Sequence, residues 1–412
     1  MNRSRQAALA ALLAGGVVAC TAATPTPSSP AGSPGTTPSA SASVLVAPSA
    51  EPPPAASLSP NHLELDIGQL DPDWLWPMLD FASDSYAVIY SSGVLDGPVG
   101  DGAPDLWRYV PGAPEPELLW RNPDRDRQLA KIAGDTDVWA FAEMSSLGER
   151  WWNLWLLTEP GGEPMLLDAH PGDEHIPSLI PSFDVDAGRV AWTSFGRGAS
   201  GAAVTRLWLA EAPTWEPRIL AEADAATRAY WLPSLRADQL AYVDVEVGAD
   251  PVEDVRHVML MDLVPGSPAA VQLDTSGNAT MPVLTEQGVI WKEPDAGFAM
   301  FNWGRLFRYS FEDGAISPLR TGPQEYVNYP SGGGRFVAMW AADSFTFAVH
   351  DLDRSASRTI VSYDNGVDSI MRPHLAGDLL VWLHSRSGSS EDGTRSPLEF
   401  AWLPEPGADR GD

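Results

Sequence analysis

A segment that begins with proline and ends at an aromatic residue recurs along this chain at a nearly constant interval. It is clearest at Pro181–Trp192 (PSFDVDAGRVAW), Pro233–Tyr242 (PSLRADQLAY), Pro282–Trp291 (PVLTEQGVIW) and Pro373–Trp382 (PHLAGDLLVW). With the looser copies, the closing aromatics are Tyr90, Phe141, Trp192, Tyr242, Trp291, Trp340 and Trp382. They are separated by 51, 51, 50, 49, 49 and 42 residues. A fixed period near 50 residues indicates an array of one supersecondary unit.

Each unit contains further short runs of branched and aromatic residues between turn residues. Leu154–Leu157 (LWLL) and Leu207–Ala210 (LWLA) follow the closing aromatic, and runs such as Pro164–Leu167 follow a Pro/Gly turn. Such runs are typical of β-strands, and no segment after residue 60 shows a sustained helical period. Four strands in each 50 residues predict an all-β fold, a β-propeller built from four-stranded antiparallel blades. The tryptophans at the closing position are expected to pack between neighbouring sheets.

The number of units predicts seven blades over residues 61–404. Six blades remain an alternative, because the first unit is degenerate and the sixth is irregular. The last unit ends at Leu403 without an outer strand, and an unassigned run, Leu63–Ile67 (LELDI), precedes the first unit. We expect this N-terminal run to complete the last blade, because closing the ring removes an exposed sheet edge that invites aggregation.

The repeats resemble the TolB-like and WD-like family of β-propeller repeats, in which a proline-led inner strand precedes an apolar strand that ends in an aromatic residue. The residues that carry the resemblance are Pro181, Gly188, Trp192, Pro233, Pro282, Gly288, Pro373 and Gly377. The resemblance covers nearly all of the repeat region. It implies a propeller with a binding habit and implies no substrate, because a fold does not determine a function.

The N-terminus has the pattern of a bacterial export signal. Two arginines lie within Met1–Arg5, and the apolar run Ala7–Val18 is too short for a stable membrane span. The following Val17-Val18-Ala19-Cys20 resembles a lipobox, which implies that residues 1–19 are a lipoprotein signal peptide and that Cys20 is lipidated. Cys20 is the only cysteine, so an intramolecular disulfide is excluded. Ordinary secretion with cleavage nearby is the alternative.

Composition predicts two disordered segments outside the propeller and argues against one class of partner. Residues 20–60 are mostly Ala, Pro, Ser and Thr with almost no charge, which predicts a disordered tether. Residues 405–412 are predicted to be a disordered tail. The expected location is extracytoplasmic, with Cys20 anchored in the bacterial cell membrane on its outer face or periplasmic side. The formal net charge of −29 argues against a nucleic-acid partner.

The candidate site is the mouth of the propeller channel, formed by the loops that enter each inner strand. Polar, charged and aromatic residues gather there, whereas the strands beside them read as apolar, which makes the mouth a candidate binding site. The aromatic candidates are Trp74, Trp76, Tyr230, Trp231, Tyr326 and Tyr329. The polar candidates are Arg127, Asp173, Glu174, His175, Arg228, Asp368 and Arg372.

Evidence for catalysis in the sequence is thin. His170 and His175 share a loop with two acids, but no third metal ligand is marked, and we predict neither a metal nor another cofactor. Two hypotheses follow. In the first, the protein is a binding or scaffold propeller that holds a glycan, a peptide or a partner protein. In the second, it is a carbohydrate-active lyase or hydrolase that uses carboxylates and His175 at the same mouth.

Overall fold

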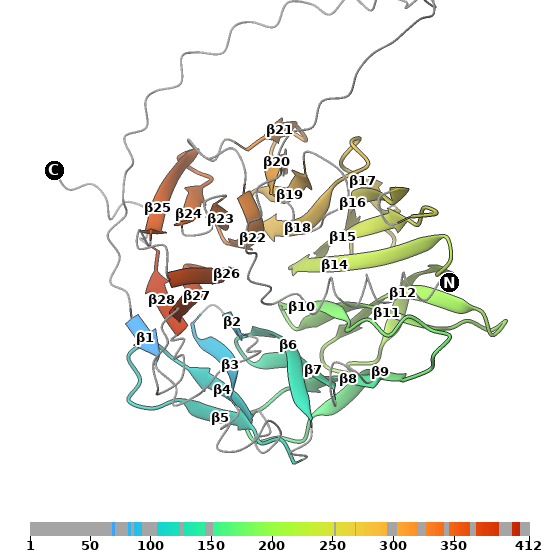
Figure 1. The fold of residues 1–412 in the computed structure, drawn as a ribbon, viewed down its shortest axis with the longest axis horizontal. Helices are drawn as coiled ribbons and strands as arrows, with labels where there is room; N and C mark the ends of the chain where they lie inside the picture. The colour runs from blue at the N-terminus through green and yellow to red at the C-terminus, as the bar shows by residue number, and fades with distance from the viewer. Residues whose placement is uncertain are drawn as a thin grey trace, which may run out of the picture.

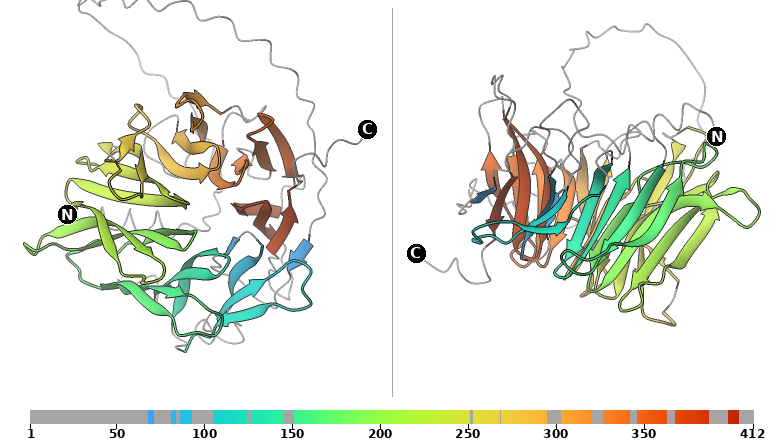
Figure 2. Two further views of the ribbon diagram at one scale, coloured as in Figure 1. Left: turned by 180° about the vertical axis from the view of Figure 1, so that it is seen from behind. Right: turned by 90° about the horizontal axis from the view of Figure 1, so that it is seen from below.

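The computed structural model has an all-β, β-propeller fold, in which antiparallel sheets surround a central axis (Figures 1 and 2). It describes residues 68–70, 81–83, 86–92, 105–123, 127–144, 151–250, 253–267, 269–294, 303–319, 327–341, 346–362, 368–386 and 398–403. Within these residues, no helix is long and apolar enough to cross a membrane.

Four separate sheets lie in chain order, and each is a meander in which consecutive strands pair antiparallel. The first contains β2 (Phe81–Ser83), β3 (Val88–Ser92), β4 (Asp105–Tyr109) and β5 (Glu117–Trp120). The second contains β6 (Gln128–Asp135), β7 (Val138–Met144), β8 (Trp151–Leu157) and β9 (Met165–Pro171). The third contains β10 (Ser182–Asp186), β11 (Arg189–Arg197), β12 (Ala203–Glu211) and β13 (Arg218–Asp224). The fourth contains β14 (Arg228–Arg236), β15 (Gln239–Glu246), β16 (Val255–Asp262) and β17 (Val271–Gln272).

The next two repeats form one eight-stranded sheet. Its first half contains β18 (Thr280–Thr285), β19 (Gly288–Pro294), β20 (Gly304–Ser310) and β21 (Ile316–Pro318). Its second half contains β22 (Val327–Gly333), β23 (Phe336–Ala341), β24 (Thr346–Asp351) and β25 (Ala356–Ser362). A single residue pair, Gly304 with Val327, connects the halves. The separate four-stranded sheets therefore number five, rather than the seven or six blades expected from the sequence.

The fifth separate sheet joins the two ends of the described chain. It contains β26 (Asp368–Ala376), β27 (Leu379–Arg386) and β28 (Leu398–Trp402), and β1 (Gly68–Leu70) pairs antiparallel with β28. Figure 1 shows β1 at the outer edge of this sheet. The run that we expected in this place, Leu63–Ile67, lies outside the described residues, and the strand at the edge begins at Gly68.

The repeat proline sits in a bulge of the inner strand. The register of the inner strand shifts around Pro233, Pro282, Pro330 and Pro373. A bulge leaves one residue unpaired, so a residue without an N–H group is tolerated there. The residues before three of these prolines have left-handed backbones: φ is 48° at Leu232, 52° at Met281 and 46° at Tyr329. The bulge therefore explains the proline in these four repeats.

The closing aromatics pack between sheets, and one of them, Trp340, does so from a different register. Trp192, Trp291 and Trp382 are almost completely buried in the cores between neighbouring sheets. In the sixth repeat, Met339 is fully buried at the equivalent register and Trp340 is only half-buried. Trp340 lies on the other face of the strand, because a shift of one residue along a strand moves a side chain to the other face, and it packs against the core between this sheet and the sheet of β26–β28.

Candidate functional site

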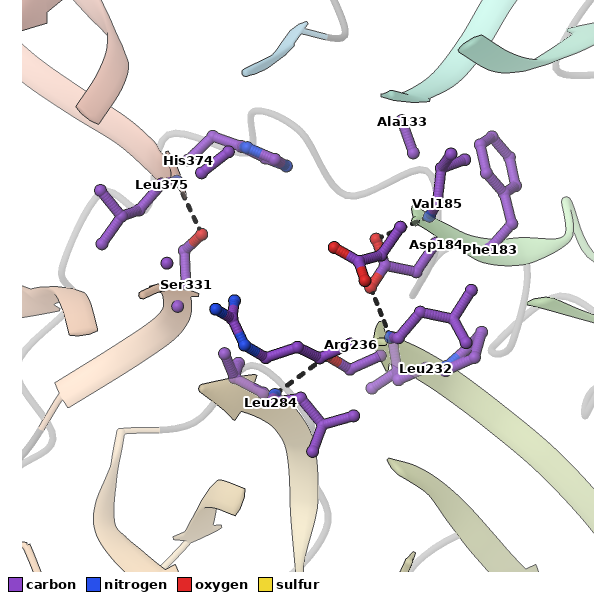
Figure 3. A pocket seen from close by; sticks show the side chains of 18 of the residues that line it. Ala133, Phe183, Asp184, Val185, Leu232, Arg236, Leu284, Ser331, His374 and Leu375 are labelled. Atoms are coloured by element: carbon purple, nitrogen blue, oxygen red, sulfur yellow. Dashed lines mark hydrogen bonds between the residues drawn. The ribbon is translucent and has the colours of Figure 1, made fainter. Parts of the chain in front are cut away.

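A cavity of about 680 Å³ follows the axis of the molecule. The inner strands β6, β10, β14, β18, β22 and β26 line it, from the bulges to the turns that end these strands (Figure 3). Its wall is not purely apolar, because Lys131, Asp184, Arg236 and His374 lie in it together with Glu286. The inner strands, which read as apolar in the sequence, thus carry most of the charged groups of this cavity.

Strand register arranges the lining residues in layers. The layer next to the bulges includes Lys131, Ser182, Leu232, Met281 and Tyr329. The middle layer consists of Ala133, Asp184, Ser234, Val283, Ser331 and His374, each two residues before the last strand pair. The layer at the turns includes Asp135, Asp186 and Arg236. Equivalent positions of the repeat therefore face one another around the cavity.

Three residues of the middle layer link neighbouring sheets. One carboxylate oxygen of Asp184 accepts a hydrogen bond from the backbone N–H of Leu235 at 2.8 Å. The hydroxyl oxygen of Ser234 accepts from Leu284 N–H at 3.0 Å, and that of Ser331 accepts from Leu375 N–H at 2.9 Å. These bonds, which we call latches, hold each inner strand to the next one and fix the width of the cavity.

Asp184 is the acid of the cavity whose pKa is raised most clearly. Its second oxygen accepts a hydrogen bond from Val185 N–H at 3.0 Å, and Figure 3 shows the carboxylate directed into the cavity. Burial raises the pKa of Asp184 to about 6, with the neighbouring charge of Asp186 adding to the rise and Lys131 opposing it. A carboxyl group with this pKa exchanges protons near neutral pH, which is a property of acid–base groups as well as of ligand-binding carboxylates.

Lys131 and His374 lie in the same wall. The Lys131 ammonium donates a hydrogen bond to the Phe183 carbonyl oxygen at 3.0 Å and lies 4.8 Å from the centre of the Phe183 ring. Burial, with a smaller contribution from the charge of Lys131, lowers the pKa of His374 to about 4. His374 is therefore neutral at physiological pH and can both donate and accept a hydrogen bond.

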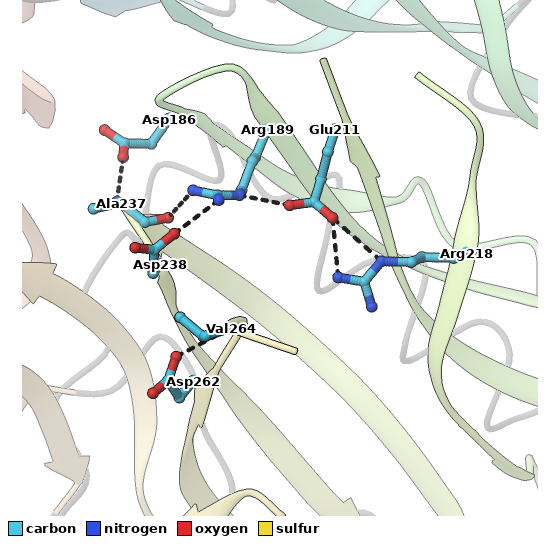
Figure 4. Close-up of polar contacts among 8 residues, drawn as sticks. All are labelled: Asp186, Arg189, Glu211, Arg218, Ala237, Asp238, Asp262 and Val264. Carbon is cyan, nitrogen blue, oxygen red and sulfur yellow. Dashed lines mark hydrogen bonds and ion pairs between the residues drawn. The ribbon is translucent and has the colours of Figure 1, made fainter. Parts of the chain in front are cut away.

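Charged residues also tie the sheets together at the turn end of the cavity. Asp186 accepts a hydrogen bond from Ala237 N–H at 2.6 Å, and Arg236 donates to Glu286 at 2.9 Å. Outside the cavity, Arg189 donates to Glu211 and to Asp238, each at 2.8 Å (Figure 4). Figure 3 shows the Arg236 guanidinium group extending across the cavity. This end of the wall thus combines carboxylates with a single guanidinium group.

Only one of the residues predicted for the mouth lines this cavity within the described part of the chain. Tyr329 is half-buried in the layer next to the bulges, and its ring centroid lies 5.9 Å from that of Trp340. Trp303 contacts the other side of this pair, at 5.5 Å from Trp340. Trp74, Trp76 and Tyr326 lie outside the described residues, as do the side chains of Asp368 and Arg372.

The other predicted residues form contacts away from the cavity. Arg127 pairs with the buried Glu143 at 2.8 Å and lines a separate groove of about 530 Å³ next to β5. Arg228 pairs with Asp244 at 2.9 Å. Tyr230 is buried against Tyr242, and half-buried Trp231 packs against an apolar cluster between sheets. Tyr230 and Trp231 therefore pack within and between sheets and do not line the cavity.

The acidic loop that was considered for metal binding does not bring its two histidines together. His170 is buried and contacts the Trp152 ring, whereas the side chain of His175 is 73% exposed beside Glu174. Asp173 forms an ion pair with Arg197; its pKa is lowered by the N–H of His175 and by Arg197. Across the residues that the structure describes, no group of three His, Cys, Asp or Glu side chains is placed to hold a metal.

Sequence reasoning missed the residues that line the middle of the cavity. Asp184, Ser234, Ser331 and His374 all fall within three residues after a repeat proline. A signal was present, because polar residues interrupt otherwise apolar inner strands at the same register. It could be recognised once the bulge was known. The bulge adds one residue to the strand, and this changes which alternate side chains face the axis.

Comparison with known proteins identifies the fold and nothing finer. No protein-family model matches the sequence, and no curated protein matches it. Among solved structures, the chain is similar to the β-propeller domain of the Trilobed protease from Pyrococcus furiosus, with a TM-score of 0.53 and 9% identity, covering 78% of this chain and 92% of that one. It is also similar to an oligogalacturonate lyase in complex with manganese, with a TM-score of 0.50 and 11% identity, covering 83% of this chain and 97% of that one. Both likenesses support the β-propeller fold.

Proposed function

We propose that this chain is a lipid-anchored binding propeller that takes a small polar ligand, such as a unit of a glycan, in its central cavity. The observation that carries the proposal is the cavity itself. Its volume of about 680 Å³ lies within the range of roughly 300–1,000 Å³ that is usual for ligand pockets. Polar groups from different sheets, including Asp184, Ser234, Ser331 and His374, converge in it, as they do in sites that orient a ligand.

The anchor is the second part of the proposal. The signal-like N-terminus and Val17-Val18-Ala19-Cys20 support lipidation of Cys20, and residues 21–60 provide a tether between the membrane and the propeller. The location is the outer face or the periplasmic side of a bacterial cell membrane. Replacing Cys20 by Ser should move the protein from the membrane fraction to the soluble extracytoplasmic fraction. Retention of this variant in the membrane would contradict the anchor.

We also propose that the propeller has seven blades, with the eight-stranded sheet counted as two. In support, the inner strands contact one another in the closed order β2, β6, β10, β14, β18, β22, β26 and again β2. One residue pair alone, Gly304 with Val327, joins the halves of the large sheet within the described residues. An experimental structure with six or fewer inner strands around the axis would reject this count.

The binding proposal is tested by thermal unfolding of the full chain against neutral, acidic and basic oligosaccharides and against short peptides. A ligand at 100 times its dissociation constant stabilises the folded state by about 2.7 kcal/mol. Ala376 contributes only a methyl group to the cavity wall, so Ala376→Trp fills the cavity without removing a side-chain hydrogen bond. A shift in the wild type that Ala376→Trp abolishes supports binding in the cavity. A shift that survives in a folded Ala376→Trp variant places the ligand elsewhere and contradicts the proposal.

Catalysis on a carbohydrate, by a lyase or a hydrolase, is the second candidate. The observation that favours it is the pKa of Asp184, about 6, in a cavity that also holds Lys131 and His374. His175, on which the sequence-based version of this hypothesis relied, is an exposed loop residue outside this cavity. Turnover of any oligosaccharide that Asp184→Asn abolishes while binding is retained would favour the enzyme over the binding protein.

A further inference from the structure

The charges in the wall of the cavity are unbalanced. Four carboxylates line it, those of Asp135, Asp184, Asp186 and Glu286, against the two permanent cations of Lys131 and Arg236. His374 adds no charge at neutral pH, because burial holds its pKa at about 4. The formal net charge of the whole chain is −29, so the surrounding field favours entry of a cation over entry of an anion.

The two cations already have partners within the protein. Arg236 is paired with Glu286 at 2.9 Å, so part of its charge is neutralised at the turn end of the cavity. The Lys131 ammonium donates to the Phe183 carbonyl oxygen and lies over the Phe183 ring. An anionic ligand would have to compete with these interactions and would also lie close to the four carboxylates.

Asp184 differs from Arg236, because it has no ion pair among the described residues. Its two oxygens accept hydrogen bonds from Leu235 N–H and Val185 N–H, which are neutral donors, and it forms no ion pair with a cation of the described residues. A carboxylate has about four acceptor positions, so each oxygen can accept one more hydrogen bond from the cavity. A partly buried carboxylate without an ion partner is stabilised strongly when a cation binds next to it.

We propose that the ligand of the central cavity carries an amine, and that its ammonium group binds the carboxylate of Asp184. This inference rests on the proposed binding function and names the chemical class of the ligand. Ser234, Ser331 and His374 lie in the same layer as Asp184, and Figure 3 shows Ser331 and His374 across the cavity from it. These neutral polar groups can bind hydroxyl groups of the same ligand. An amino sugar has both kinds of group.

The test uses the full chain and three trisaccharides that differ in charge: a trimer of glucosamine, its fully N-acetylated form, and trigalacturonate. Affinity is measured by calorimetry at pH 7 and low ionic strength. We expect the glucosamine trimer to bind at least tenfold more tightly than the other two. Asp184→Asn keeps an oxygen that can accept from Leu235 N–H, so it is expected to fold, and it should weaken binding of the glucosamine trimer at least tenfold.

Two further variants separate a local charge from the overall charge. Glu216→Gln removes one negative charge at an exposed position outside the cavity and should leave affinity unchanged. Arg236→Gln removes a cation from the cavity wall and should leave binding of the glucosamine trimer equal or tighter. The Asp184 contact would be overturned if Glu216→Gln lost as much affinity for the glucosamine trimer as Asp184→Asn and both losses were twofold or greater. Only the net charge of the protein would then matter.

The remaining outcomes distinguish failure of this inference from failure of the proposed function. If trigalacturonate or the acetylated trimer binds most tightly, and Ala376→Trp abolishes that binding, the cavity is a binding site and the amine inference is wrong. If none of the three trimers binds, the amine inference is overturned as well. If, in addition, no compound in the wider thermal-unfolding panel binds in the cavity, the proposed function fails with it.

Discussion

Two contacts between neighbouring inner strands, built from the same repeat, are held together in different ways. Between β10 and β14, side chains bond to the backbone of the next sheet: Asp184 accepts from Leu235 N–H and Asp186 accepts from Ala237 N–H. Between β18 and β22, the middle layer carries Val283, which has no hydrogen-bonding group. A Cβ atom added to Gly332 would lie 2.3 Å from a methyl group of Val283, so the strands approach closely there.

The close approach of β18 and β22 comes with a different set of bonds. In the turns after β18 and β22, Glu286 N–H donates to the Gly334 carbonyl oxygen at 3.0 Å. At the other end of β22, Val327 pairs with Gly304 of β20, and the fully buried Lys292 ammonium of β19 donates to the Asn328 side-chain oxygen. The comparison shows that a latch is not the only way to join sheets. Between β18 and β22, where β18 has no polar side chain in the middle layer, Gly332 lets the strands approach closely.

The largest expected effect concerns Lys292 of β19, whose bond to Asn328 of β22 has no counterpart between β10 and β14 in the described residues. Burial lowers its pKa from 10.5 to about 7. Between these two values the unfolded chain binds more protons than the folded one, so this group makes the free energy of unfolding rise with pH, by up to about 1.4 kcal/mol per pH unit.

Lys292→Met should flatten this rise between pH 7 and 9.5 in chemical denaturation. Lys292→Arg, whose charge is permanent, should also be flat but less stable than Lys292→Met. Equal slopes in the wild type and Lys292→Met would contradict the assignment.

The close backbone contact itself is tested at Gly332. In Gly332→Ala the new methyl group meets Val283 at 2.3 Å and a Thr285 methyl group at 3.2 Å, and overpacking of this kind costs about 1–3 kcal/mol. The free energy of unfolding should fall by that amount. Adding Val283→Ala makes room, so the double variant should be more stable than the sum of the two single changes. Strict additivity would show that the two residues do not limit the approach of the sheets.

The latch formed by Asp184 is tested through the pH dependence of stability, on which Asp184 and His374 have opposite effects. The pKa of Asp184 is raised to about 6, so its contribution to stability is present below pH 3.8 and is lost as pH rises through 6. The pKa of His374 is lowered to about 4, so its contribution is present above pH 6.5 and is lost as pH falls through 4.

Each of the two variants should therefore change the pH dependence in its own direction. Relative to the wild type, Asp184→Asn should be less stable at pH 4 than at pH 7, and His374→Gln should be more stable at pH 4 than at pH 7. With allowance for solvent in the cavity, each change should be about 1–2 kcal/mol. Urea denaturation at both pH values measures it. A change of the same sign in both variants would show that one of the two pKa directions is wrong.

The smallest effects are expected from the neutral latches. Ser234→Ala and Ser331→Ala each leave one backbone N–H without its acceptor and should cost about 1 kcal/mol. Ser182→Ala is the control, because Ser182 lines the same cavity one layer nearer to the bulges and makes no side-chain hydrogen bond to the described residues. If all three variants lose the same stability, the latch bonds contribute nothing specific to the contact.

The predictions from the sequence were strongest where they used the repeat and weakest where they placed side chains. Strands follow the expected order throughout the described residues, and three of the closing tryptophans are buried between sheets. Of the residues predicted to line the mouth, Tyr329 lines the cavity, but Arg127, Arg228 and Tyr230 form contacts between or within sheets. Loop sequences say which residues are polar, whereas the direction of each side chain depends on the bulge within the inner strand.

The repeat of about 50 residues with short strands could be predicted from the sequence alone, because periodic burial leaves a periodic pattern of prolines and aromatics. The tertiary structure alone decided which residues meet at the axis. Asp184, Arg236 and His374 are more than 50 residues apart at the least and come from separate sheets, and only closure of the ring brings them into one cavity. Contacts across the axis also depend on how closely neighbouring sheets approach, and residues so far apart in the chain carry no local signal of that approach.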